Sequence, residues 1–133
     1  MAVNDNEDSF NIDVTGSKTG KNYVGQFKAI KFLSFNNELQ IDALRRQLLG
    51  NAVGTPTERA ANEAELLANV GIRVTDGPSW FNDTNGLLNC FDDEPLSSVY
   101  SQCVAVTNKA MDAVKKKAED AKKSLAAPQE ETV

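Results

Sequence analysis

Residues 20–34 read GKNYVGQFKAIKFLS, and residues 35–50 continue without interruption as FNNELQIDALRRQLLG. Tyr23, Phe27 and Ala29 follow one another at intervals of four and two positions, which is the pattern of a strand with one buried face. Ser34 then offers an N-cap hydroxyl to a helix predicted over residues 35–49, and Gly50 fits the left-handed position that follows a helix. This segment therefore predicts an extended ribbon that leads directly into an amphipathic helix.

The residues before this segment predict its partner strand. Phe10, Ile12 and Val14 alternate with polar residues, and the cluster Gly16–Gly20 is a turn signal. We therefore expect a β-hairpin over residues 10–32, preceded by a polar, acidic arm at residues 1–9. Because an isolated hairpin is marginal in water, its apolar side must pack on helices or on another chain.

The residues after Gly50 predict a second helix and a connector. Thr55, Pro56 and Glu58 supply an N-cap, a first-turn proline and a capping-box acid for a helix over residues 56–70. Residues 72–75 either continue that helix or form a short extended piece. In the connector at residues 75–91, the turn Pro78–Phe81 is expected to insert its aromatic side chains into the core.

A long helix is predicted over residues 93–125, capped by Asp92 or Asp93 and followed by a tail at residues 126–133. Its apolar positions alternate at spacings of four and three, the seam of a heptad repeat, which permits packing within or between chains. They are Leu96, Tyr100, Cys103, Thr107, Ala110 and Val114. The predicted fold class is thus α+β, with an N-terminal β-hairpin packed on a small helical bundle and a long C-terminal helix.

Charge is unevenly distributed along this last helix. Residues 109–123 contain six lysines and three acidic residues, a net charge of +3, so the remainder of a chain with net charge −5 carries −8. Such an asymmetry could guide head-to-tail contact between copies, or it could attract an acidic partner. The alternative is that the lysines only make this face of the helix soluble.

Composition limits the classes of function. A chain of 133 residues with 41% hydrophobic residues predicts one domain. Its net charge of −5 argues against a nucleic-acid partner, and its apolar runs are too short to cross a membrane. The two cysteines and the lack of a basic-then-apolar leader favour a soluble protein of a reducing cytoplasm.

The chain contains no histidine, which removes the usual general base and the commonest metal ligand. Two cysteines cannot complete a structural zinc site, and Cys103 is expected to be a small buried hydrophobe. We therefore expect a protein that is not an enzyme, with no cofactor and no metal site.

Three apparent motifs fail on their details. Gly16–Lys21 has one residue too few for a phosphate-binding loop and precedes a strand, so a hairpin turn is expected. Phe81–Asp92 has the middle of a calcium loop but not its first and last ligands. Asp92–Glu94 opens a helix, where acidic residues act as caps and dipole partners.

Recognition residues are the remaining functional candidates. We select Tyr23, Phe27, Arg45, Arg46, Trp80 and Phe81. Trp80 and Phe81 are either a core plug or an interface anchor, because buried aromatic residues dominate interface energetics. Arg45 and Arg46 either pair with internal acids such as Asp42 or reach a neighbouring subunit.

The order of these short motifs carries a resemblance. G-K-x-Y-x-G-x-F is followed by an L-S helix start, D-x-x-R-R-x-L-L-G, an Ala/Glu-rich helix, V-x-x-x-P-x-W-F and a closing helix. This order resembles a group of small structural and tail-assembly-chaperone-like proteins of tailed bacteriophages. The resemblance covers most of residues 16–123.

The resemblance implies a non-enzymatic bacteriophage structural protein, a virion component assembled in the host bacterial cytoplasm. Its partners would be other phage structural proteins, copies of itself, or both. One alternative is a tail assembly chaperone that is absent from the mature particle. A small nucleotide- or metal-binding protein is a weaker alternative.

Overall fold

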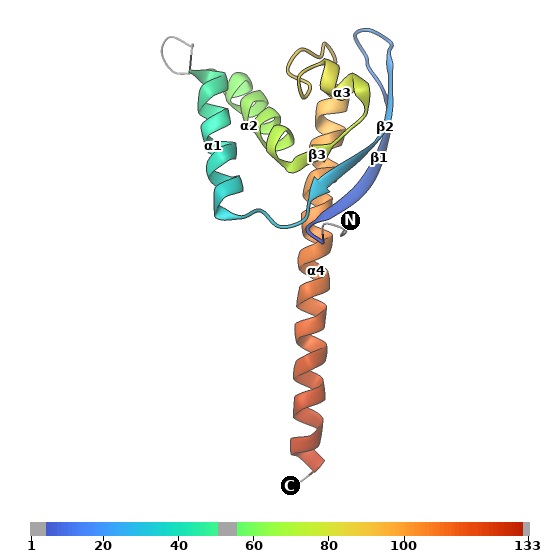
Figure 1. Ribbon diagram of the computed structural model, residues 1–133, viewed down its shortest axis with the longest axis vertical. Helices are drawn as coiled ribbons and strands as arrows, with labels where there is room; N and C mark the ends of the chain where they lie inside the picture. Colours follow the sequence, from blue (N-terminus) through green and yellow to red (C-terminus); the bar gives the residue numbers. More distant parts are fainter. Residues whose placement is uncertain (1–4, 51–55, 132–133) are drawn as a thin grey trace.

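A computed structural model of the chain describes residues 5–50 and 56–131, with side chains up to residue 123. A three-stranded antiparallel sheet packs beside a long helix and a helical hairpin (Figure 1). The strands are β1 (Glu7–Thr15), β2 (Asn22–Ile30) and β3 (Val74–Asp76), in the order β1-β2-β3. The helices are α1 (Phe35–Leu49), α2 (Glu58–Arg73), α3 (Ser79–Asp83) and α4 (Asp93–Glu131). The predicted α+β fold class is confirmed.

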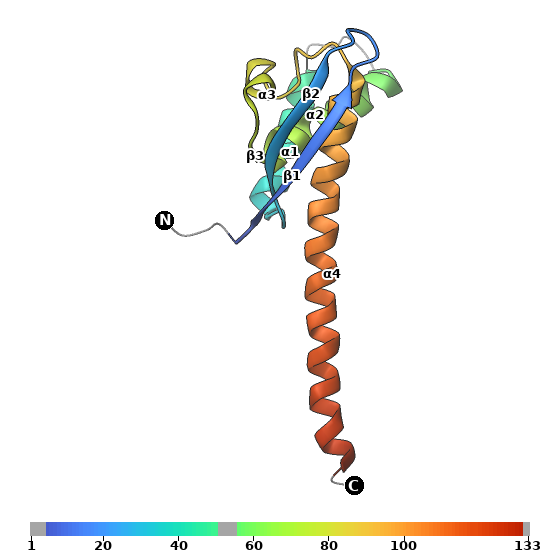
Figure 2. The same ribbon diagram turned by 90° about the vertical axis from the view of Figure 1, so that its right-hand side faces the viewer.

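Alternation along the hairpin builds the core. Phe10 on β1 lies opposite Phe27 on β2, and the two rings stack with their centroids 5.2 Å apart. Phe27 is fully buried, and the buried face of the sheet meets Val70 of α2 and Cys103 of α4 within one core cluster. The sheet lies across the upper half of α4, and the lower half of α4 extends beyond every other element (Figure 2).

The hairpin is longer than predicted at its N-terminal end. β1 begins at Glu7, so three residues of the predicted acidic arm are paired with residues 28–30 of β2. Residues 72–75 were predicted either to continue the second helix or to form a short extended piece, and the structure contains both. Ile72 and Arg73 continue α2, whereas Val74 pairs with Ala29 in β3.

The end residues of α1 were predicted correctly, but Gly50 was not. Ser34 caps α1 by accepting a hydrogen bond from the backbone N–H of Asn37, in a reciprocal capping box. Gly50 has a right-handed φ of −65° instead of the predicted left-handed conformation. Its N–H donates to the carbonyl of Gln47, so the last turn tightens and no left-handed residue is needed there.

The second and last helices differ from prediction at their ends. α2 begins at Glu58, not at residue 56, because the hydroxyl of Thr57 accepts a hydrogen bond from the N–H of Ala60. The predicted cap, Thr55, lies outside the described residues. α4 continues to Glu131, across most of the predicted tail. Residues 126–131 read AAPQEE, in which Ala, Gln and Glu favour helix, whereas Pro128 removes one backbone hydrogen bond of the helix.

Candidate functional site

Half of the predicted interaction residues lie in the core. Tyr23, Phe27 and Phe81 are buried, and the ring of Phe27 packs edge-on against Phe81 with centroids 5.3 Å apart. These side chains hold the sheet on α3 and leave less than a tenth of their surface exposed, of which the Phe81 part lines a groove. Of the two alternatives for Phe81, the structure thus contains the core plug.

Trp80 lies at the boundary between core and surface. Its indole N–H donates to the backbone carbonyl of Val24 at 2.9 Å, and its ring packs edge-on against Tyr23 and Phe27. The side chain is half-buried. Trp80 therefore fixes α3 to β2, and its role as an interface anchor stays a prediction.

Arg45 and Arg46 both pair with Asp42 on the same helix. The guanidinium groups lie 2.7 and 3.0 Å from the two carboxylate oxygens. The hydrogen bond from Arg45 is the main cause that lowers the pKa of Asp42. Internal pairing is thus what the structure contains, although the Arg46 side chain remains largely exposed and accessible to a partner.

The strongest polar cluster joins the β1–β2 loop to the residue before α4. The carboxylate of Asp92, almost fully buried, accepts hydrogen bonds from the backbone N–H groups of Lys18 and Thr19 at 2.8 and 3.1 Å. It also accepts from the hydroxyls of Thr19 and Tyr23 at 2.6 and 2.7 Å. Glu94 accepts from the N–H of Ser17 at 3.2 Å. We call this cluster the Asp92 latch, because it ties the hairpin tip to the start of α4.

Hydrogen bonding fixes the protonation states in the Asp92 latch. The hydroxyl of Thr19 is the largest contribution that lowers the pKa of Asp92, to about 2. The hydrogen bond that the Tyr23 hydroxyl donates to Asp92 is the main cause that raises the pKa of Tyr23 well above its usual range. The carboxylate is a very weak base and the phenol a very weak acid at neutral pH. The latch is therefore suited to holding two segments together and poorly suited to general acid–base chemistry.

The latch also explains the glycine-rich loop. Backbone N–H groups of residues 17–19 point at carboxylates, so the loop does bind an anion, as phosphate-binding loops do. The anions are the protein's own carboxylates, Asp92 for residues 18 and 19 and Glu94 for residue 17. A Cβ at Gly16 would overlap the Asp92 carboxylate, which explains why the loop begins with glycine. Among the described residues, no group of three or more Cys, Asp or Glu side chains is placed to hold a metal ion.

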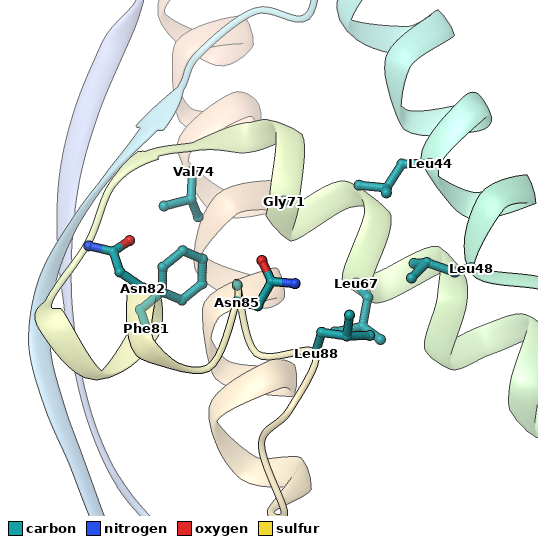
Figure 3. A pocket seen from close by; sticks show the side chains of 10 residues that line it. Leu44, Leu48, Leu67, Gly71, Val74, Phe81, Asn82, Asn85 and Leu88 are labelled. Carbon is teal, nitrogen blue, oxygen red and sulfur yellow. The ribbon is translucent and has the colours of Figure 1, made fainter.

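A groove opens between α1, α2 and residues 81–88, which belong to α3 and the segment after it (Figure 3). We call it the leucine groove; its volume is about 380 Å³. Leu44 and Leu48 of α1 form one wall, and Leu67 and Gly71 of α2 form the floor. The opposite wall includes Phe81 and Leu88.

The lower part of α4 is the second exposed feature. We call residues 109–123 the arm. Every described side chain from Met111 to Lys123 is exposed, including the apolar Met111 at 52% and Val114 at 56%. The heptad seam predicted for α4 is therefore covered at Cys103, which is fully buried, partly covered at Ala110, and exposed at its last member, Val114.

Sequence reasoning missed the Asp92 latch and the leucine groove. It placed Asp92 as a helix cap, and the sequence around Asp92 does not reveal which distant N–H groups its carboxylate would meet. The groove had a partial signal, because Leu44 and Leu48 are four residues apart on an apolar side of a predicted helix. What that side faces depends on the placement of α3, which is a tertiary feature.

Comparisons of the chain with protein-family models, with curated proteins and with solved structures found no match. Within residues 5–50 and 56–131, no helix combines the length and the hydropathy that a bilayer crossing requires.

Proposed function

We propose that this chain is a non-enzymatic structural protein that acts by protein–protein association as a component of a bacteriophage particle. The observation that carries the proposal is the arm, a helical extension with exposed apolar side chains at Met111 and Val114. Contact with another protein would remove this apolar surface from water, which favours association. The setting in a phage particle rests on the motif order of residues 16–81.

Helix energetics support a partner for the arm. In water, an isolated helix of about 12–15 residues is marginal, and most helices in proteins are stabilised by packing of an apolar side. The arm has an apolar side, and its described residues from Met111 to Lys123 are exposed, with Val114 lining a hollow together with Asp8 and Phe32 of the same chain. Other phage structural proteins or further copies of this chain would provide the missing packing.

Mass spectrometry of gradient-purified particles of the encoding phage tests the proposal. We expect abundant peptides of this protein, in an amount that corresponds to many copies per particle. Their absence from purified particles, together with their presence in lysates of infected cells, would overturn the virion role. That outcome would instead favour a tail assembly chaperone that leaves before the particle is complete.

A further inference from the structure

We propose that the arm of one copy packs into the leucine groove of a second copy, in a head-to-tail contact. This inference rests on the proposed function and names the partner of the arm. Both surfaces belong to the same chain, both are apolar, and they are compatible in spacing, in charge and in direction.

The spacing of side chains fits a helix in a groove. The groove presents Leu44 and Leu48 on one helix, and Leu67 and Gly71 on the next, each pair four residues apart. Rows at this spacing form the ridges and grooves into which another helix packs. Gly71 has no side chain, and the Leu44 side chain of α1 lies against it, because a Cβ at Gly71 would come within 3.2 Å of Leu44 Cδ2. The two helices are therefore close together at the floor of the groove.

The arm presents the matching pattern. Met111 and Val114 are three residues apart, and Ala118 and Ala121 continue the same side of the helix at spacings of four and three. An amphipathic helix that binds in a groove uses side chains at such spacings as its contacts with the groove. The two larger side chains would fill the groove, and the two alanines would allow close contact beyond it.

Charge favours an arm-to-body contact over an arm-to-arm contact. The arm carries a net charge of +3, whereas residues 1–108 hold eight basic and fourteen acidic residues, a net charge of −6; Glu130 and Glu131 at the end of α4 carry the remaining −2. Two parallel arms would bring like charges together, whereas an arm on a second body brings opposite charges together. Complementary charge speeds encounter and selects the partner orientation.

The direction of α4 prevents the same contact within one chain. The first half of α4 is fixed beside the sheet, and the arm continues it in a straight line away from the groove (Figure 1). The arm and the groove are therefore different surfaces of one molecule. A contact between two different surfaces is heterologous and repeats from copy to copy, which gives a ring when it closes and a filament when it does not.

Two variants of the full chain block one surface each. Met111→Gln with Val114→Gln makes the arm polar without changing its charge, and glutamine retains helix propensity. Leu48→Gln with Leu88→Gln makes both walls of the groove polar. Leu39→Gln is the matched control, because Leu39 is exposed on α1 and does not line the groove. Circular dichroism and urea denaturation check that each variant remains folded.

Sedimentation velocity over a range of protein concentrations gives the result. We expect the unmodified chain and the Leu39 control to self-associate, and each blocked variant to do so at least about tenfold more weakly. A mixture of the two blocked variants should form a heterodimer, because one intact arm and one intact groove remain. We also expect association to weaken as salt concentration rises.

Three outcomes would overturn the head-to-tail contact. They are a monomeric unmodified chain, a groove variant that associates normally while the arm variant does not, and a mixture that yields no heterodimer. The second outcome would indicate a bundle of arms. These results are independent of the virion test, because a protein found in particles without self-association would refute only the contact, and a self-associating protein absent from particles would refute only the virion role.

Discussion

Tyr23 has two separable roles at the scale of the residue. Its ring packs against Trp80, and its hydroxyl donates to Asp92 at 2.7 Å. Tyr23→Phe keeps the ring and removes only the hydroxyl, so its bond to the buried Asp92 carboxylate is lost, together with the weak bond that it accepts from the Cys90 thiol. We expect the free energy of unfolding to fall by about 1.5–3 kcal/mol. Urea denaturation should show a lower midpoint with an unchanged slope.

Tyr100→Phe is the control for this measurement. It removes the same atom from a half-exposed tyrosine on α4, and we expect a change below about 0.5 kcal/mol. Equal effects of the two variants would contradict a special contribution of the bond between Tyr23 and Asp92.

Asp92 should make stability depend on pH in the acid range. Its pKa is about 2 in the fold, compared with an ordinary value of 3.8. Because the pKa is lowered by folding, the ionised carboxylate stabilises the fold above about pH 4, and this contribution is lost as the pH falls toward 2. Melting temperature measured against pH should therefore drop steeply in this interval.

Asp92→Asn should have a lower melting temperature at neutral pH and a shallower drop between pH 4 and pH 2. Some slope should remain, because folding also lowers the pKa values of Asp42 and Glu94. A variant as steep as the unmodified chain would show that other carboxyl groups cause the acid dependence.

At the scale of the element, local signals were sufficient wherever an element is decided by its own residues. The range of α1 follows from Ser34 and the apolar spacing after it, and both lie within a single segment. β3 could not be predicted in the same way, because three residues become a strand only when β2 lies beside them. Likewise, the sequence places Asp92 near the start of a helix, but it does not reveal the partners of its carboxylate. Two of these partners, Lys18 and Thr19, lie more than 70 residues earlier in the chain.

The contact between the hairpin loop and α4 leads to a prediction about two glycines of one loop. A methyl group at Gly16 would overlap the Asp92 carboxylate, whereas at Gly20 it would meet open space but force a side chain to a φ of +73°. We expect Gly16→Ala to destabilise the fold by about 1–3 kcal/mol and Gly20→Ala by about 1–2 kcal/mol. The causes differ, so the two variants should respond differently to a change at Asp92.

A double-mutant cycle with Asp92→Ala separates the two causes. In that background the overlap at Gly16 is gone, so we expect the effect of Gly16→Ala to shrink by about 1 kcal/mol or more. The effect of Gly20→Ala should stay the same, because its backbone conformation is strained whatever residue 92 is. Additive behaviour at both glycines would contradict the placement of the loop against Asp92.

At the scale of the whole molecule, the body and the arm use one helix for two purposes. The first half of α4 closes the core with Val99 and Cys103, which are fully buried, and burial raises the pKa of the Cys103 thiol to about 12. The second half contributes its charge and its exposed apolar side chains to the outside. Folding and association therefore depend on different residues of α4, and a change in the arm should leave the body intact.

Removal of residues 115–133 tests this separation. Because the described side chains from Lys115 to Lys123 are exposed, their loss removes no core packing. We expect the free energy of unfolding, measured by urea denaturation, to change by less than about 0.5 kcal/mol. The far-ultraviolet circular dichroism spectrum should lose the helical signal of the arm. Val99→Ala is the contrasting variant, since a cavity at a fully buried position should cost about 1–3 kcal/mol without shortening the helix. A truncated chain that unfolds as readily as Val99→Ala would mean that the arm stabilises its own body, and the division of α4 into a core half and an association half would then be wrong.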